Sequence, residues 1–182
     1  MKIDLLNQEL FQKSISTLKE TSYDATNDEY MTECSKNALD FDNIKRTYTN
    51  ALGFSEEYMK SVDALLYFSK EITFVEFKNG NMKNAKKEIK EKTLDSLLLF
   101  CDVTKKGLSF TRNNLDFILV YNEEKNSGGL SHSKSRDKIS EYCLEKSGEE
   151  LIHFGLEKLK GVHFREVHTY TKEEFSGFFT WC

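Results

Sequence analysis

The 182-residue sequence contains no proline, no internal repeat and no low-complexity segment. A proline-rich linker between two domains is therefore excluded, and a chain of this length suits one domain with a sizeable core. We attach no functional meaning to the missing proline. We predict a single domain over residues 1–182, made of an N-terminal helical part (1–61), a motif-bearing sheet and helix (62–122), and a C-terminal loop, helix, strand and terminal helix (123–182).

Long apolar runs are also missing. No run approaches the 18 residues that indicate a membrane-spanning helix, so we expect no membrane partner. The first residues, MKIDLLNQELFQ, carry charges within their apolar pattern, and this does not fit a secretory signal peptide. We therefore predict a cytoplasmic location.

The cysteines are few and widely scattered, with no C-x-x-C pair among them. Their spacing indicates neither a zinc site nor a redox-active pair. In a cytoplasmic protein we expect all of them to be reduced. They are Cys34, Cys101, Cys143 and Cys182.

A strong excess of positive charge is absent as well, since the formal net charge is −4. This argues against a protein that coats nucleic acid without specificity, because such chains are strongly basic. A local basic patch does occur between residues 78 and 92, which hold six lysines and two acids. Its alternative interpretation is a solvated helix face. Including a later Ser-rich loop, the candidate substrate-binding residues are Lys83, Lys86, Lys92, Lys134 and Arg136.

Apolar periodicity predicts helices first and then a strand hairpin. Helical spacing over Ile3–Glu20 predicts an amphipathic helix, and a further helical region would break near Gly53. The runs Val62–Ser69 and Ile72–Lys78 are apolar and aromatic and are joined by a short polar break, which is typical of a hairpin.

The second half of the chain predicts a long helix and further strands. The helix covers Ala85–Lys106 and would face Ile89, Leu94, Leu97, Leu98 and Cys101 inward. The other expected elements are a strand over Leu115–Asn122, a helical region to about Lys160, a strand over Val162–Tyr170 and a helix that begins with a capping box of Thr171 and Glu174. Together these elements predict an α/β (α+β) fold with one small mixed β-sheet flanked by helices.

Two charged residues interrupt the second strand of the expected hairpin. Glu76 and Lys78 are two residues apart, so their side chains project from the same face of the strand. A two-residue hairpin loop places Asp63 opposite Glu76, and a four-residue loop places it opposite Lys78. A three-residue loop would pair Asp63 with Phe77, on the other face. The cluster therefore depends on an even number of residues in this loop, or on a bend at Asp63.

The carboxylates of Asp63 and Glu76 would repel each other at this spacing unless a cation lay between them. Hard divalent ions such as Mg²⁺ bind one or two carboxylates and keep several waters. The ion lowers the pKa of a bound water and polarises a phosphoryl oxygen, while a nearby lysine helps to orient the water. The residue types thus predict phosphodiester hydrolysis with Mg²⁺ or Mn²⁺ as cofactor.

Asp63, twelve intervening residues and the tripeptide EFK (Glu76-Phe77-Lys78), in a hairpin followed by a long helix, resemble the PD-(D/E)XK nuclease superfamily. The resemblance covers Asp63 to Asn122 and implies a restriction-endonuclease-like fold. It also implies the catalytic residues Asp63, Glu76 and Lys78, with Asp63, Glu76 and the Phe77 carbonyl as metal ligands and Lys78 acting on the attacking water. Many members use a further acidic residue from the preceding helical region, for which the candidates are Glu33, Asp40, Asp42, Glu56 and Glu57.

These observations predict a metal-dependent nuclease that acts on DNA in preference to RNA, with phage defence as one expected setting. The alternative is a non-catalytic protein-binding module on a nuclease-like fold, such as an immunity protein or a subunit of a defence complex. The sequence also leaves open a homodimer or a larger complex. A purely structural interpretation of Glu76 and Lys78 is an edge strand whose exposed charges screen each other.

Overall fold

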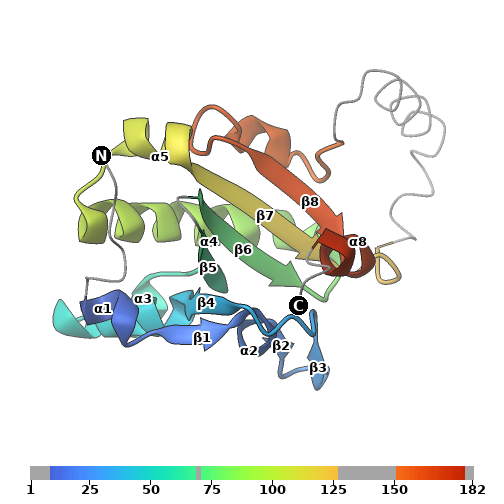
Figure 1. The fold of residues 1–182 in the computed structure, drawn as a ribbon, viewed down its shortest axis with the longest axis horizontal. Coiled ribbons are helices and arrows are strands. Elements are labelled where there is room, and N and C mark those ends of the chain that lie inside the picture. The colour runs from blue at the N-terminus through green and yellow to red at the C-terminus, as the bar shows by residue number, and fades with distance from the viewer. Residues whose placement is uncertain (1–8, 69–70, 127–150, 179–182) are drawn as a thin grey trace.

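The structure, a computed structural model, describes residues 9–68, 71–126 and 151–178, which form a mixed α+β fold (Figure 1). Six strands of this part of the chain build one sheet. They are β1 (Ile15–Thr17), β4 (Asn37–Asp40), β5 (Ala64–Phe68), β6 (Glu71–Lys78), β7 (Leu115–Tyr121) and β8 (Val167–Thr171), in the order β1-β4-β5-β6-β7-β8. The predicted mixed sheet flanked by helices is confirmed at this level. A small separate hairpin consists of β2 (Tyr23–Asp24) and β3 (Glu29–Tyr30).

Helices flank this sheet, and the longest of them, α4, lies behind β6 and β7 in Figure 1. The helices are α1 (Glu9–Gln12), α2 (Leu18–Thr21), α3 (Phe41–Ala51), α4 (Met82–Thr104), α5 (Leu108–Asn114) and α8 (Lys172–Phe178), with 3-10 turns η2 (Glu56–Tyr58) and η3 (Leu156–Leu159). Among the described residues, no helix combines the length and the apolar character that crossing a membrane requires.

The sheet changes from antiparallel to parallel at β6. Strands β1, β4, β5 and β6 pair antiparallel, whereas β6, β7 and β8 are parallel, and α4 provides the crossover between β6 and β7. In the hairpin, Phe68 pairs with Glu71 and Ala64 pairs with Val75, which is the register of a two-residue loop. Asp63 is next in this register and lies across from Glu76. The even parity on which the candidate cluster depends is therefore present.

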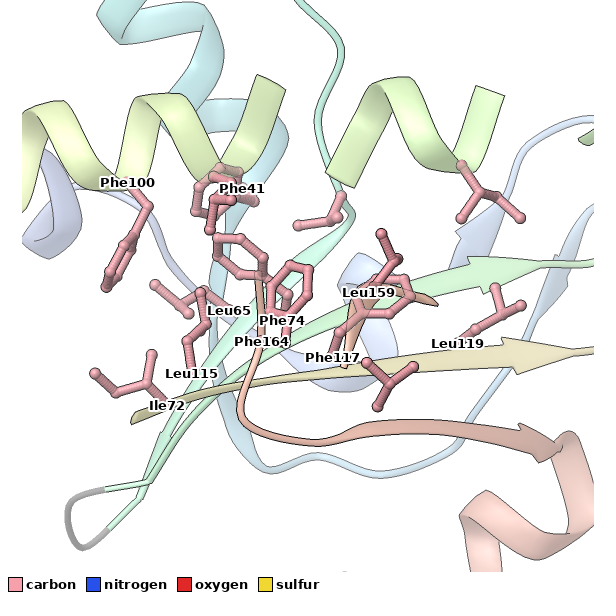
Figure 2. Close-up of a cluster of buried hydrophobic side chains, with 14 of the residues drawn as sticks. Phe41, Leu65, Ile72, Phe74, Phe100, Leu115, Phe117, Leu119, Leu159 and Phe164 are labelled. Carbon is pink, nitrogen blue, oxygen red and sulfur yellow. The ribbon is translucent and has the colours of Figure 1, made fainter. Parts of the chain in front are cut away.

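The sheet carries an apolar cluster on each face. Leu65, Phe74 and Phe117 belong to the larger cluster, which packs beneath α4 and which Figure 2 shows in close-up. Val75 and Phe77 belong to the cluster of the opposite face. Because side chains alternate along a strand, Asp63 lies on the face of Leu65 and Glu76 lies on the face of Phe74. Both carboxylates therefore face α4.

Helix α4 begins at Met82, three residues earlier than its predicted start, and the side chain of Asn81 caps it by accepting the N–H of Lys83. The predicted inward face is right for Ile89 and Leu97, which are buried. It is wrong for Leu98, which is 63% exposed, because each residue advances the helix by about 100° and Leu98 follows the buried Leu97. The buried residues Leu99 and Phe100 take its place in the core.

The N-terminal part is only partly helical. The expected helix over Ile3–Glu20 is wrong where the structure describes it, because β1 separates α1 from α2 and pairs with β4. Thr17 ends β1 and caps α2 by accepting the N–H of Glu20. Helices α1 and α2 have four residues each and bury Phe11 and Leu18, respectively. Apolar residues from two short helices therefore produced the spacing that predicted one continuous helix.

The C-terminal part also differs from the predicted pattern. The helical region expected to reach Lys160 falls partly outside the described residues, and residues 151–160 contain only η3. Strand β8 begins at Val167 rather than Val162, because residues 161–166 form a turn in which Gly161 has a φ of 71°. The capping box is confirmed: the Thr171 N–H donates to Glu174 Oε2 at 2.7 Å, and the Glu174 N–H donates to Thr171 Oγ1 at 3.1 Å.

The cysteines differ from the expectation at one position. Cys34 is buried and disulfide-bonded, so the prediction that all cysteines are reduced is wrong for Cys34. Cys101 on α4 is a free thiol, and burial raises the pKa of this thiol. A thiol with a raised pKa is a poor nucleophile, which fits a packing role for Cys101.

Candidate functional site

Two carboxylates from neighbouring strands meet at one ammonium group. Asp63 immediately precedes β5, and Glu76 lies near the carboxyl end of β6. The Nζ of Lys92, which α4 supplies, lies 3.2 Å from Asp63 Oδ1 and 2.7 Å from Glu76 Oε1. The structure therefore brings Asp63 and Glu76 together and adds a lysine from a third element.

This cluster is largely withdrawn from solvent. The side chain of Glu76 is 1% exposed and that of Lys92 is 20% exposed. Burial, followed by the charge of Asp63, raises the pKa of the Glu76 carboxyl well above its usual range. Burial also raises the pKa of Asp63, although Lys92 opposes this shift. Burial alone would lower the pKa of the Lys92 ammonium, but the two carboxylates outweigh it and raise the pKa. Lys92 is therefore a permanent cation at neutral pH.

One oxygen of this cluster has no partner. Glu76 Oε2 is buried and makes no hydrogen bond within the structure. An unsatisfied buried acceptor of this kind costs free energy, and for a carboxylate oxygen the cost is larger than for a neutral group. A hard cation takes carboxylate oxygens as ligands, so this atom fits a divalent metal ion.

The backbone of Phe77 also faces the two acids. Its N–H donates to Asp63 Oδ2 at 2.6 Å. In a strand, the N–H and C=O of one residue point to the same neighbouring strand, so the Phe77 carbonyl points to the Asp63 side as well. The Lys78 carbonyl points the other way and accepts the N–H of Asn122 at 3.2 Å. Asp63, Glu76 and the backbone of Phe77 therefore lie together near the carboxyl end of β6.

Lys78 lies on the same face as Glu76 but has a different partner. Its Nζ is 3.0 Å from Glu88 Oε2 on α4, and this hydrogen bond lowers the pKa of Glu88. Among the described residues, the ion pairs of Asp63 and Glu76 are with Lys92. Sequence reasoning assigned Lys92 to substrate binding. The signal that could have indicated its position is the four-residue spacing of Glu88 and Lys92, which puts both on one face of the helix.

Asp42, in the first turn of α3, is the acid that best fits the supporting role expected from the preceding helical region. It accepts a hydrogen bond from Ser61 Oγ, and its charge contributes to the raised pKa of Asp63. The other candidates have different surroundings: Asp40 caps α3, Glu33 pairs with Lys19, and Glu56 and Glu57 lie in or beside η2.

Two pockets meet at Asp42. The first, of ≈ 390 Å³, is bordered by Asp63, Phe77, Lys78 and residues 21–27 around the β2–β3 hairpin. The second, of ≈ 610 Å³, is bordered by Glu88 and Lys92 of α4 and by residues of α3 and η2. The basic residues of its wall are Lys45, Arg46, Lys60 and Lys92. The cluster thus lies between two accessible hollows, which suits a site that acts on a ligand from solvent.

The predicted substrate-binding residues have three different settings. Lys83 and Lys86 are exposed on the first turns of α4, close in the chain to the end of β6. Lys92 is paired with the two acids. Lys134 and Arg136 lie outside the described residues.

The cluster brings together two carboxylates, which do not make a complete metal cage. In the part of the chain that the structure describes, no three Asp, Glu, His or Cys side chains group so as to hold a metal ion. Two carboxylates and a carbonyl still suffice for Mg²⁺, which keeps several of its waters. In comparisons with known proteins, the chain matches no family model, no curated protein and no solved structure.

Proposed function

We propose that this protein is a metal-dependent nuclease of the PD-(D/E)XK type, with a restriction-endonuclease-like fold, that hydrolyses phosphodiester bonds of DNA. The observation that carries the proposal is the convergence of Asp63, Glu76 and the Phe77 backbone beside a pocket, with Glu76 Oε2 buried and unpaired. The two-residue register of the hairpin and α4 as the following element further support it.

In this proposal Asp63, Glu76 and the Phe77 carbonyl hold Mg²⁺ or Mn²⁺. When bound there, the ion supplies an activated water and polarises a phosphoryl oxygen. The side chain of Lys78 projects from the same face as Glu76, and Lys78 borders the ≈ 390 Å³ pocket, so its ammonium could donate a hydrogen bond to the attacking water or to a phosphate oxygen. Lys83 and Lys86 lie near the start of α4 and would contact phosphates of the substrate, as would Lys134 and Arg136.

Cleavage assays test the proposal directly. We expect wild-type protein to cut plasmid DNA with Mn²⁺ or Mg²⁺, and we expect Asp63→Asn and Glu76→Gln to lose activity by about 10²-fold or more while remaining folded. Glu91→Gln is a matched control, because Glu91 lies on α4 and pairs with Lys60 rather than with the cluster. If folded wild-type protein with Mn²⁺ cuts neither DNA nor RNA, the proposal fails.

A second candidate function is the non-catalytic binding module. The observation that favours it is the pairing of Lys92 with both acids, since an internal cation makes a metal unnecessary for neutralising the cluster. This alternative predicts that Mn²⁺ does not bind and that a tightly associated protein co-purifies with the chain. Measurable binding of Mn²⁺ that Asp63→Asn abolishes would eliminate it.

A further inference from the structure

Lys92 occupies one oxygen of each carboxylate that a metal ion would bind. Its ammonium holds Asp63 Oδ1 at 3.2 Å and Glu76 Oε1 at 2.7 Å. Asp63 Oδ2 already accepts the Phe77 N–H at 2.6 Å, which leaves Glu76 Oε2 as the acceptor without a partner. A cation that binds both carboxylates must therefore either take an oxygen from Lys92 or share Asp63 Oδ2 with the Phe77 N–H.

Charge also opposes the presence of both cations at this pair of carboxylates. An ammonium and a divalent ion on the same pair of carboxylates would be a few ångströms apart in a largely buried site, where their repulsion is much stronger than in water. Glu76 is almost completely buried, so solvent does little to screen this repulsion. Binding of a divalent ion and the present position of Lys92 are thus alternatives.

We propose that Lys92 is a built-in counter-ion of Asp63 and Glu76, which a divalent cation displaces when it binds. The inference rests on the proposed metal site. Replacement of one positive charge by two gains electrostatic free energy at a pair of carboxylates, so a divalent ion can compete with the ammonium. A monovalent ion such as Na⁺ or K⁺ carries no such advantage.

Glu88 is an alternative partner for the displaced ammonium of Lys92. Lys92 borders the ≈ 610 Å³ pocket together with Glu88, which lies four residues earlier on the same helix. Glu and Lys at this spacing, with Glu nearer the N-terminus, form a favourable pair. Glu88 presently pairs with Lys78 at 3.0 Å. Transfer of Lys92 to Glu88 would therefore release Lys78 for contact with water or phosphate when the metal arrives.

Calorimetric titration with Mn²⁺ tests the exchange. We expect Lys92→Met to bind Mn²⁺ with a dissociation constant at least about tenfold lower than that of wild type, because no internal cation has to be displaced. Lys60→Met is the matched control: it removes the same charge from the wall of the ≈ 610 Å³ pocket, but Lys60 pairs with Glu91. Its dissociation constant should remain within about threefold of the wild-type value.

The outcomes separate this inference from the proposed function. Binding by both proteins, tighter in Lys92→Met, supports the exchange. Binding in that variant alone would overturn it, because Mn²⁺ would then not displace the ammonium in wild type. If wild type binds Mn²⁺ and Lys92→Met binds it equally or less tightly, the exchange is overturned while the proposed metal site stands. If neither protein binds Mn²⁺, the metal site and the exchange both fail.

A second measurement uses the wild-type chain and does not depend on the folding of a variant. Acetylation of lysine amines, read by mass spectrometry, should modify Lys92 several-fold faster with saturating Mn²⁺ than without it, because the displaced amine lies in the open pocket. Lys105 is the internal reference, since it is exposed and pairs with Asp102, away from the site. An acetylation rate of Lys92 that Mn²⁺ leaves unchanged, relative to Lys105, would overturn the exchange.

Discussion

At the scale of single residues, the ion pair between Lys92 and Glu76 is central to stability in the absence of metal. Removal of one partner from a buried pair leaves an uncompensated charge and typically costs about 3–5 kcal/mol. Lys92 is 20% exposed, which places the expected cost at the lower end of that range. We predict that Lys92→Met lowers the free energy of unfolding by about 3 kcal/mol in EDTA, as measured by urea denaturation at pH 7.

An exposed ion pair provides the control. Lys13 pairs with Glu9 at 2.5 Å, but both side chains are mainly in solvent, so Lys13→Met should change the free energy of unfolding by less than about 1 kcal/mol. If the two substitutions lowered the free energy of unfolding equally, the buried pair would contribute no more to stability than the exposed pair. Addition of Mn²⁺ should restore part of the free energy of unfolding that Lys92→Met loses. For Lys13→Met, Mn²⁺ should increase the free energy of unfolding by no more than it does for wild type.

Phe74 holds the core beneath α4 and supports the strand that carries Glu76. Its ring centroid lies 5.0 Å from that of Phe41, 5.8 Å from that of Phe100 and 6.0 Å from that of Phe164 (Figure 2). We predict that Phe74→Ala lowers the free energy of unfolding by about 3–5 kcal/mol through lost packing and the resulting cavity. Phe54→Ala, at an exposed ring, should cost less than about 1 kcal/mol in the same denaturant titration.

Part of the site follows from residue patterns alone. The period of two along a strand puts Glu76 and Lys78 on one face, and the two-residue register adds Asp63. The contact of Lys92 with both acids does not follow, because it depends on how α4 is rotated and placed over the sheet. That placement comes from packing of residues such as Ile89 and Phe100 against strands distant in sequence, which local periodicity does not encode.

At the scale of elements, the small β2–β3 hairpin borders the ≈ 390 Å³ pocket and is tied to the rest of the fold by Glu29. The carboxylate of Glu29 pairs with Lys172 of α8 and accepts a hydrogen bond from Asn79 at 3.0 Å, just beyond β6. The hydrogen bond from Lys172, followed by that from Asn79, lowers the pKa of Glu29 below its ordinary value of 4.5. These contacts fix the outer wall of the pocket.

The lowered pKa of Glu29 predicts a pH dependence. A carboxyl whose pKa is lower in the folded state stabilises the fold above about pH 4.5, and this contribution is lost as the pH falls through the folded-state pKa. We predict that Glu29→Gln is less stable than wild type by about 0.5–1 kcal/mol at pH 7, since Glu29 is 41% exposed. The difference should shrink as the pH falls through the folded-state pKa. Urea denaturation over a series of pH values below 7 measures it, and a difference that does not change as the pH falls would contradict this origin.

The elements themselves were predictable in proportion to their length. Helix α4 has 23 residues, and β6 and β7 have eight and seven, so their apolar patterns are long enough to detect. Helices α1 and α2 have four residues each and β1 has three, which is little more than one repeat of either pattern. The extended form of β1 comes from its pairing with β4, a contact between segments some 20 residues apart.

At the scale of the whole molecule, the parallel pairing of β6 with β7 and β8 gathers the carboxyl ends of these strands at one edge of the sheet. Glu76 and Lys78 lie at this edge, and α4 starts beside it four residues after β6 ends. Lys83 and Lys86 therefore lie near the site even though the chain as a whole has a net charge of −4. A substrate with phosphates would meet positive charge locally rather than over the whole surface.

This local positive charge predicts how DNA binding depends on salt. Each phosphate contact from a lysine adds about 0.9 to the slope of log K against log salt concentration, so the double substitution Lys83→Ala/Lys86→Ala should reduce the slope by up to about 1.8. Fluorescence anisotropy of labelled duplex DNA, measured in a Glu76→Gln background that prevents cleavage, gives this slope. The same two-charge change at Lys105 and Lys106, at the far end of α4, should leave it unchanged. Equal slopes for the two double variants would place the DNA away from the start of α4, whereas a selective reduction would place it across the edge of the sheet that carries Asp63 and Glu76.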